Sequence, residues 1–158
     1  ANENHPGIQL DFSLANNGGL RTSIPAGEIS VRNVFELLPF ENELVLLSIN
    51  GDQLVELANH IAFRGGEGVS GISFGLKNGK ATNILLGGKK IDPNANYWLI
   101  TNDYIANGGD GMKILTQAAK RIETGEKIRD VVIRRLKQMT AKGQHINAKI
   151  DGRIYNAE

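Results

Sequence analysis

The stretch Trp98–Met112, WLITNDYIANGGDGM, decides the fold. It opens with the apolar, β-branched run Trp98–Thr101, which is typical of a buried strand. A glycine-rich turn follows at Asn107–Gly111, and apolar residues at helical spacing begin at Met112, so the stretch predicts a strand, a loop and the start of a helix. Such a junction directs backbone N–H groups and the positive end of a helix dipole at whatever fills the loop. Two interpretations remain open: a ligand-binding loop, or a plain turn in which Asp110 caps the helix.

A second junction of this kind lies near the start of the chain. Apolar residues alternate from Ile8 to Leu14, a pattern that predicts a strand, and the stretch Asn16–Arg21 (NNGGLR) follows it. Asn-Gly within an extended run favours a hairpin or a tight turn. Arg21, at the exit of this turn, is either a surface residue or a clamp for an anion such as phosphate.

The remaining elements mix strands and helices. Strands are expected at Glu43–Asn50, Val69–Phe74, Ala81–Leu86 and Tyr97–Thr101, and helices at Val34–Leu38, from Asn50 to Arg64, from Met112 to Ala119 and at Ile128–Lys142. Asn78-Gly79 is the clearest hairpin signal, and Ser30 or Asn33 is expected to cap the first helix. This mixture predicts an α+β class, or a layered α/β arrangement, in a single domain spanning residues 1–158.

Composition limits the classes of function. With 158 residues, 41% of them hydrophobic and 22% charged, the chain fits one globular domain. The net charge of +1 gives no electrostatic case for a nucleic-acid polymer or an acidic membrane surface, and no apolar run approaches the ~20 residues of a membrane span. The lack of cysteine excludes a disulfide scaffold and a thiolate metal site. The basic residues of Arg129–Lys142 alternate with apolar ones, which indicates the solvated face of a helix.

The residues with ligating or reactive side chains form no recognisable catalytic motif. His5, His60 and His145 lie far apart without the spacing of a metal site, so each is expected to have a structural or solvent-facing role. Asp103 and Asp110 lie near one loop, but nothing marks either as a general acid. These residues favour a binding site without catalytic machinery.

Three side chains suit the binding of a flat, anionic ligand. Arg21 supplies a cation, and Phe40 and Tyr104 supply two aromatic faces. Two rings near an arginine match a planar base that carries a phosphate. Because Phe40 follows a proline in a loop, its ring is either a plug of the core or a platform for a ligand.

Four motifs occur in an order that resembles a known family. They are Asn16–Arg21, Leu38–Asn42 (LPFEN), Ser70-Gly71 and Asn102–Gly111 (NDYIANGGDG). From about Leu10 to Arg153 the chain resembles the C-terminal domain of the 5'-nucleotidase family, which includes UDP-sugar hydrolases and 2',3'-cyclic-nucleotide phosphodiesterases. The resemblance implies a layered α/β/β/α fold. It also implies an N-terminal metallophosphoesterase domain that holds two divalent metal ions, such as zinc or manganese, to which the C-terminal domain presents the nucleotide.

The resemblance implies substrate-binding roles for nine residues, namely Asn16, Gly18, Gly19, Arg21, Phe40, Asn42, Gly71, Tyr104 and Asp110. Arg21 matches an arginine that holds the substrate phosphate, and Asp110 matches an aspartate that binds the ribose hydroxyls. Phe40 and Tyr104 match the two aromatics that enclose the base. Asn16 matches an asparagine that contacts the substrate, Asn42 matches one that reaches the base, and Gly71 lies where backbone approaches the base.

The sequence departs from the family pattern in three ways. Tyr104 stands where phenylalanine is common, and its hydroxyl needs water or a partner. The metal motifs Asp-x-His and Gly-Asn-His-Glu are absent, and a segment with another phosphate-binding arginine is expected upstream of Ala1.

The expected function is therefore nucleotide recognition within a two-domain hydrolase, exported to the periplasm or cell surface, with this chain not catalytic alone. Its expected partners are the nucleotide or nucleoside ligand and the N-terminal metal-binding domain. The alternative is a stand-alone nucleotide-binding or interaction module without hydrolase activity.

Overall fold

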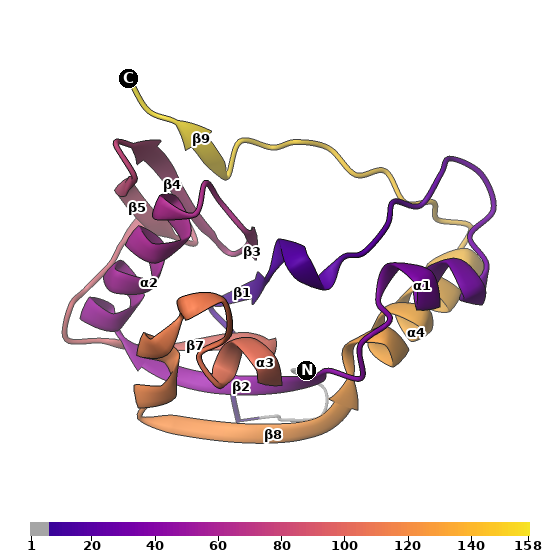
Figure 1. Cartoon of the computed structure of the whole chain (residues 1–158), viewed down its shortest axis with the longest axis horizontal. Coiled ribbons are helices and arrows are strands. Elements are labelled where there is room, and N and C mark those ends of the chain that lie inside the picture. The colour runs from indigo at the N-terminus through magenta and orange to yellow at the C-terminus, as the bar shows by residue number, and fades with distance from the viewer. Residues whose placement is uncertain (1–6) are drawn as a thin grey trace.

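The computed structural model of the chain describes residues 7–158 and contains two mixed β-sheets (Figure 1). One sheet has the strand order β3-β1-β7-β2-β8, with bounds Gly68–Ser70 (β3), Phe12–Ala15 (β1), Asn96–Asn102 (β7), Glu43–Asn50 (β2) and Lys120–Lys127 (β8). The other has the order β6-β5-β4-β9, with bounds Lys89–Lys90 (β6), Lys80–Leu86 (β5), Ile72–Lys77 (β4) and Ile154–Asn156 (β9).

One helix packs against both sheets, and two others pack against each other at one end of the molecule (Figure 1). The α-helices are α1 (Val31–Leu37), α2 (Gly51–Phe63), α3 (Asp103–Ala106) and α4 (Ile128–Ala141), and short 3-10 helices occupy Asn17–Gly19 (η1), Gly109–Gly111 (η2) and Lys113–Gln117 (η3). Helix α2 contacts strands of both sheets, whereas α1 and α4 lie together at the other end of the molecule (Figure 1). The predicted α+β class, with helices and sheets in layers, is confirmed.

Strand β2 forms the centre of the core. Residues Val45–Ile49 are all buried, as the continuous apolar run predicted for a strand covered on both faces. Helix α2 buries Leu54, Leu57 and Ile61 in the same core. Asn50 ends β2 and caps α2 through a capping box with Gln53, which fixes the angle at which the helix leaves the sheet.

The local turn and cap signals are confirmed. Lys77 pairs with Lys80 across the predicted hairpin, and Asn78 and Gly79 adopt φ values of 52° and 71°, as a type I′ turn requires. Ser30 caps α1, which begins at Val31, three residues before the predicted start.

The predictions for the two glycine loops have different outcomes. No long helix follows Met112: the one short 3-10 helix after it, η3, ends at Gln117, and the unpredicted strand β8 begins at Lys120 and pairs with β2. Asp110 therefore does not cap a helix. Of the two forms predicted for Asn16–Arg21, the structure contains the tight turn, a single 3-10 turn at Asn17–Gly19. It is not a hairpin, because β1 pairs with β7 and β3 rather than with the residues after the turn.

Candidate functional site

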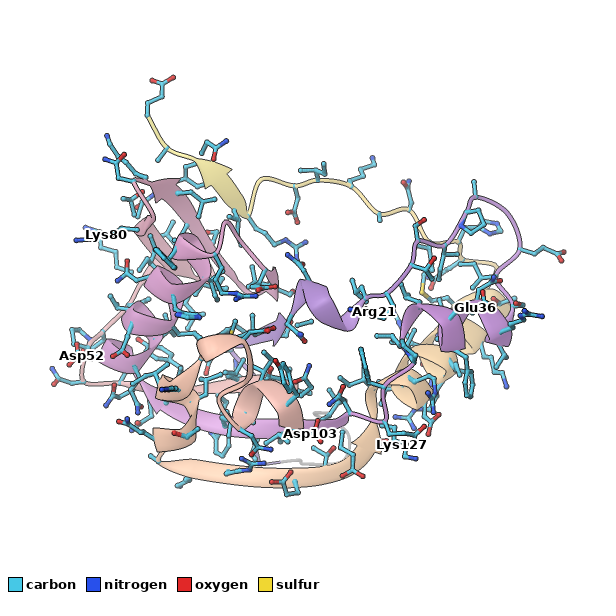
Figure 2. All side chains as sticks on the ribbon, viewed as in Figure 1. Arg21, Glu36, Asp52, Lys80, Asp103 and Lys127 are labelled. Carbon is cyan, nitrogen blue, oxygen red and sulfur yellow. The ribbon has the colours of Figure 1, made fainter. Side chains whose placement is uncertain are left out.

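The sheet topology brings three predicted loops to one edge. Strand β1 runs parallel to β7, so the residues that follow both strands, Asn16 and Asp103, leave the sheet at the same side. Strand β2 is antiparallel to β7 and pairs Leu44 with Asn102, so the loop Pro39–Asn42 enters the sheet at that side too. Figure 2 labels Arg21 after η1 and Asp103 at the start of α3. Sequence motifs 20 to 90 residues apart thus share one edge.

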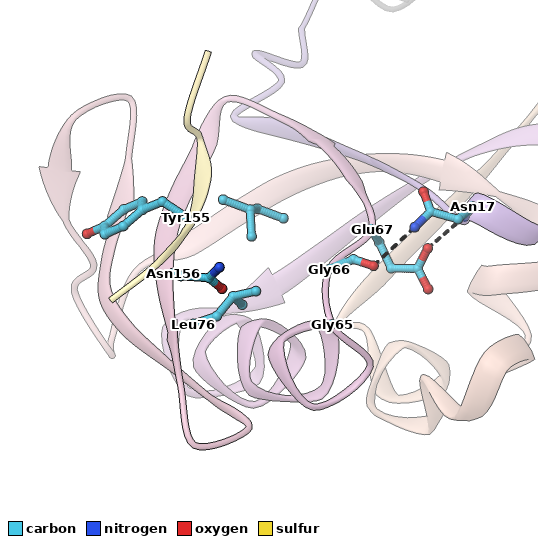
Figure 3. A pocket seen from close by; sticks show the side chains of 8 residues that line it. Asn17, Gly65, Gly66, Glu67, Leu76, Tyr155 and Asn156 are labelled. Carbon is cyan, nitrogen blue, oxygen red and sulfur yellow. Dashed lines mark hydrogen bonds between the residues drawn. The ribbon is translucent and has the colours of Figure 1, made fainter. Parts of the chain in front are cut away.

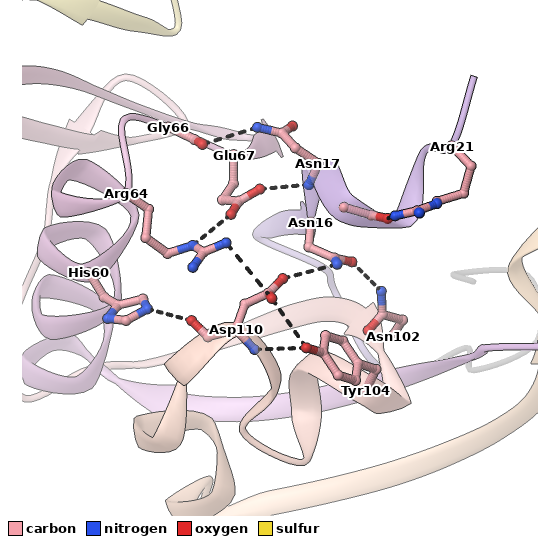
Figure 4. Close-up of polar contacts among 11 residues, drawn as sticks. Asn16, Asn17, Arg21, His60, Arg64, Gly66, Glu67, Asn102, Tyr104 and Asp110 are labelled. Atoms are coloured by element: carbon pink, nitrogen blue, oxygen red, sulfur yellow. Dashed lines mark hydrogen bonds and ion pairs between the residues drawn. The ribbon is translucent and has the colours of Figure 1, made fainter. Parts of the chain in front are cut away.

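A chain of amide and carboxylate contacts joins two of these loops (Figure 4). Asn102 donates from Nδ2 to Oδ1 of Asn16 at 3.0 Å, and Asn16 donates from Nδ2 to Oδ2 of Asp110 at 3.0 Å. Asn102 also caps α3 by accepting from the backbone N–H of Ile105. Both asparagines are buried, so the carboxylate of Asp110 has a fixed position at the sheet edge.

Tyr104 is bonded to the same carboxylate. Its hydroxyl donates to Oδ1 of Asp110 at 3.2 Å and accepts from the backbone N–H of Asp110 at 3.2 Å. The partner that the tyrosine hydroxyl was expected to need is therefore Asp110. A Cβ on Gly109 would lie 2.5 Å from Cε1 of Tyr104, so the ring rests directly on the glycine loop. Even so, 47% of Tyr104 is exposed and available for stacking.

Helix α2 contributes residues that the sequence analysis missed. His60 Nε2 lies 2.9 Å from the carbonyl oxygen of Asp110, and Arg64 Nη2 lies 3.8 Å from its carboxylate. Arg64 also donates to Glu67, whose buried side chain accepts the backbone N–H of Asn17 at 2.6 Å. The hydrogen bond to Glu67 raises the pKa of Arg64. The only sequence signal here, Arg64-Gly65-Gly66, indicated the end of a helix.

Arg21 and Phe40 face each other at the third loop. The guanidinium carbon of Arg21 lies 5.9 Å from the centre of the Phe40 ring, within the range of a cation–π contact. Phe40 is 49% exposed, so the interpretation of its ring as a core plug is wrong. Arg21 donates to the carbonyl oxygen of Gly18 at 3.4 Å and has no carboxylate within 4.0 Å among residues 7–158.

Asn42 connects the Phe40 loop to α3. Its Nδ2 donates to Oδ1 of Asp103 at 2.7 Å, and the same oxygen accepts the backbone N–H of Tyr104 at 2.9 Å. The loops that carry the two predicted aromatic residues are thus joined through one carboxylate.

The three predicted glycines lie in different surroundings. A Cβ on Gly19 or Gly18 would lie 3.2 or 3.6 Å from the Asn16 amide, so η1 wraps closely around that side chain. Gly71 is not brought into this cluster. It joins β3 to β4 next to Asp11, at the opposite end of β1 from Asn16.

A separate hollow of about 430 Å³ adjoins the network (Figure 3). Its lining residues are Asn17, Gly65, Gly66, Glu67, Leu76, Ile154, Tyr155 and Asn156. Asn17 and Glu67 belong to both the hollow and the network. Phe40 and Tyr104 do not line the hollow, so the predicted base site lies outside it.

Glu41, next to Phe40, carries a strongly shifted pKa. Hydrogen bonds from Lys127, the larger cause, and from Arg129 lower the pKa of Glu41 from 4.5 to about 2. The folded state therefore holds these ion pairs fully above about pH 4.5 and loses their stabilisation as the pH falls from 4.5 toward 2.

Titration of the Glu41 carboxyl by carbon-13 NMR is expected to give a midpoint of about 2. Lys127→Met should raise that midpoint toward 4.5, because it removes the larger cause of the shift. Asp151 is the matched control: Arg153 lowers its pKa to about 2, and Lys127→Met should leave it unchanged. A midpoint of 4.5 for Glu41 in the unsubstituted protein would contradict the ion pairs.

Residues 7–158 contain no group of three or more histidine, aspartate or glutamate side chains that could hold a metal ion. Over the same residues, no helix has the length and apolar character to cross a membrane. His5 lies outside the described residues, and His145 lies in the exposed segment after α4.

Sequence comparisons identify a family. The family model described as "5'-nucleotidase, C-terminal domain" matches residues 5–117. The chain is 33% identical over 122 residues to the 5'-nucleotidase of Vibrio vulnificus (strain CMCP6), covering 74% of this chain and 22% of that protein. It is 32% identical over 120 residues to Protein UshA of Escherichia coli (strain K12), covering 73% and 22%.

A solved structure agrees with the sequence comparisons. The crystal structure of the 5'-nucleotidase precursor from Thermus thermophilus has a TM-score of 0.81 and 31% sequence identity, covering 99% of this chain and 33% of that one. The chain spans about a fifth of the length of the two curated relatives. The chain belongs to the 5'-nucleotidase family and represents its C-terminal domain.

Proposed function

We propose that this domain binds a nucleotide and presents its phosphate to a dimetal centre on an N-terminal metallophosphoesterase domain of the same protein. One observation carries the proposal. The carboxylate of Asp110 accepts hydrogen bonds from Asn16 and from the half-exposed Tyr104, and it lies at the same sheet edge as the contact between Arg21 and Phe40. Two rings, a carboxylate and a guanidinium match the base, sugar and phosphate of a nucleotide.

Each group has a separate task in this proposal. The base stacks between Phe40 and Tyr104, and the Asn42 amide reaches its edge. The ribose hydroxyls donate to Asp110, whose two oxygens offer about four acceptor positions, of which Asn16 and Tyr104 use two. Arg21 binds the phosphate through its planar fork. Gly18 and Gly19 add no side chains of their own to the η1 turn.

Hydrolysis belongs to the parent protein in this proposal. The chain covers 22% of the Vibrio vulnificus relative named 5'-nucleotidase, so most of a protein of that length would be available for a hydrolytic domain. Two divalent ions there, such as zinc or manganese, would activate the attacking water. The present domain supplies recognition and orientation, and export of the parent protein to the periplasm or cell surface is part of the same proposal.

Calorimetric titration of the chain with adenosine and with AMP tests the proposal. Arg21→Ala is expected to weaken AMP binding by about 10- to 150-fold, because hydrogen bonds to charged groups contribute about 1.5–3 kcal/mol, while adenosine binding changes little. Arg32→Ala is the matched control, because Arg32 is exposed and, among residues 7–158, forms an ion pair only with Glu36 on α1.

Two results would contradict the proposal at different levels. Equal losses for AMP and adenosine in Arg21→Ala would refute the phosphate role of Arg21. Failure of the unsubstituted chain to bind either ligand would refute a nucleotide site contained in this domain.

A further inference from the structure

The loop Pro39–Asn42, which carries Phe40, is anchored by residues about 85 to 90 positions later in the chain, where β8 ends and α4 begins. Residues 127–129 connect β8 to α4 and lie beyond residues 5–117, which the family model matches. The backbone N–H of Ile128 donates to the carbonyl oxygen of Asn42 at 3.1 Å, and Lys127 pairs with Glu43 in the sheet. Lys127 also forms an ion pair with Glu41. The C-terminal side of the loop is therefore fixed by this segment.

Arg129 fixes both sides of the same loop. Its side chain is only 8% exposed, and Nη1 donates to the carbonyl oxygen of Leu38 at 3.3 Å while Nη2 forms an ion pair with Glu41. Its guanidinium carbon lies 4.0 Å from the centre of the Phe35 ring, which adds a cation–π contact on α1. One guanidinium thus holds residue 38 and residue 41, on either side of Phe40.

The ring of Phe40 depends on this anchor. Half of Phe40 is exposed, so burial in the core does not set its direction. With Leu38 and Glu41 held, only Pro39 and Phe40 lie between the two fixed points, and the proline ring locks one of their backbone angles. Few backbone rotations then remain that would turn the Phe40 ring away from Arg21.

We infer that Arg129 is a positioning residue for base recognition: it holds Phe40 in the direction in which the ring stacks on a base. The inference rests on the proposed function for the identity of the ligand, and on the contacts of Arg129 for the mechanism. Arg129 has no role in holding phosphate or ribose in this scheme.

A double-mutant cycle with calorimetry tests the inference. Arg129→Met keeps an apolar stem but removes the guanidinium group, and it is expected to weaken adenosine binding about tenfold, in the lower half of the range for loss of one stacked base. Phe40→Ala should have a similar effect, and the double variant should bind no more weakly than Phe40→Ala alone. Binding of ribose 5-phosphate, which has no base, should be unchanged in all three variants.

Two further variants separate positioning from general damage. Arg129→Lys should recover part of the affinity, because it keeps the charge beside Glu41 but cannot reach two partners as a fork. Arg134→Met is the control, because Arg134 lies on the same helix and pairs with Glu126 at 2.6 Å, away from the Phe40 loop. It should bind adenosine like the unsubstituted chain.

Additive effects of Arg129→Met and Phe40→Ala, or an equal loss for ribose 5-phosphate, would overturn the inference. If Arg129→Met does not fold, Glu41→Gln removes the same ion pair from the loop side and enters the same cycle. If the unsubstituted chain does not bind adenosine, the proposed function fails first. The mechanism is then judged by NMR, where contacts between the Phe40 ring and Arg21 should be lost in Glu41→Gln, and their retention would overturn it.

Discussion

Tyr104→Ala is expected to weaken adenosine binding by roughly 5- to 150-fold, because stacking of one base contributes about 1–3 kcal/mol. The substitution removes the ring and also the hydroxyl that bonds twice to Asp110. Calorimetric titration with adenosine measures the loss. Unchanged affinity would exclude the Tyr104 ring from the base site.

Tyr104→Phe separates the two contributions of this side chain. It keeps a ring that stacks but leaves Asp110 without its tyrosine partner, so the carboxylate that is proposed to bind ribose loses one of its supports. Adenosine affinity should fall by less than in Tyr104→Ala. Affinity for 2',3'-dideoxyadenosine, which lacks the 2'- and 3'-hydroxyls of the ribose, should be the same in Tyr104→Phe and in the unsubstituted protein. Equal losses for Tyr104→Phe and Tyr104→Ala would contradict the stacking role.

Elements with local signals could be predicted from the sequence. The apolar run of β2, the Asn78-Gly79 turn and the asparagine cap of α2 each depend on residues a few positions apart. Strand β8 could not be predicted in this way. Its residues Lys120–Lys127 are mostly charged or polar and are extended only because they pair with the edge of β2 opposite β7, about 80 residues earlier in the chain.

The candidate site also contains residues with local sequence signals and residues whose role depends on distant contacts. Asn16, Arg21 and Tyr104 stand beside glycine-rich turns, so the sequence indicates them directly. His60, in the last turn of α2, and Arg64, its C-terminal cap, reach Asp110 through contacts that exist only once η3 packs against that helix. Helical periodicity indicates which face of α2 is buried but not which loop its polar residues meet.

Gly71→Ala is expected to destabilise the fold more than any other glycine substitution at the predicted site. Gly71 is the single residue between β3, in the five-stranded sheet, and β4, in the four-stranded sheet. Its φ of +83° is unfavourable for residues with a Cβ, and a Cβ here would overlap the carbonyl oxygen of Asp11 and lie 3.0 Å from Cα of Phe12. Backbone of another strand cannot move aside as a flexible side chain does.

Gly65→Ala is the matched control for this substitution. Gly65 has a φ of +85°, but nothing lies within 4 Å of the Cβ position. Its substitution therefore measures only the cost of placing a Cβ in the left-handed conformation, about 1–2 kcal/mol. The overlap at Gly71 should add a further 1–3 kcal/mol, roughly, in the free energy of unfolding measured with urea. Equal losses at the two positions would refute the close approach of Asp11.

The same pair of variants decides what Gly71 contributes to binding. If the backbone of Gly71 contacts the base, folded Gly71→Ala protein should bind adenosine more weakly than folded Gly65→Ala protein at the same temperature. If Gly71 serves only the turn between the sheets, the two variants should bind adenosine alike once folded. The position of Gly71, at the end of β1 opposite Asn16, favours the second outcome.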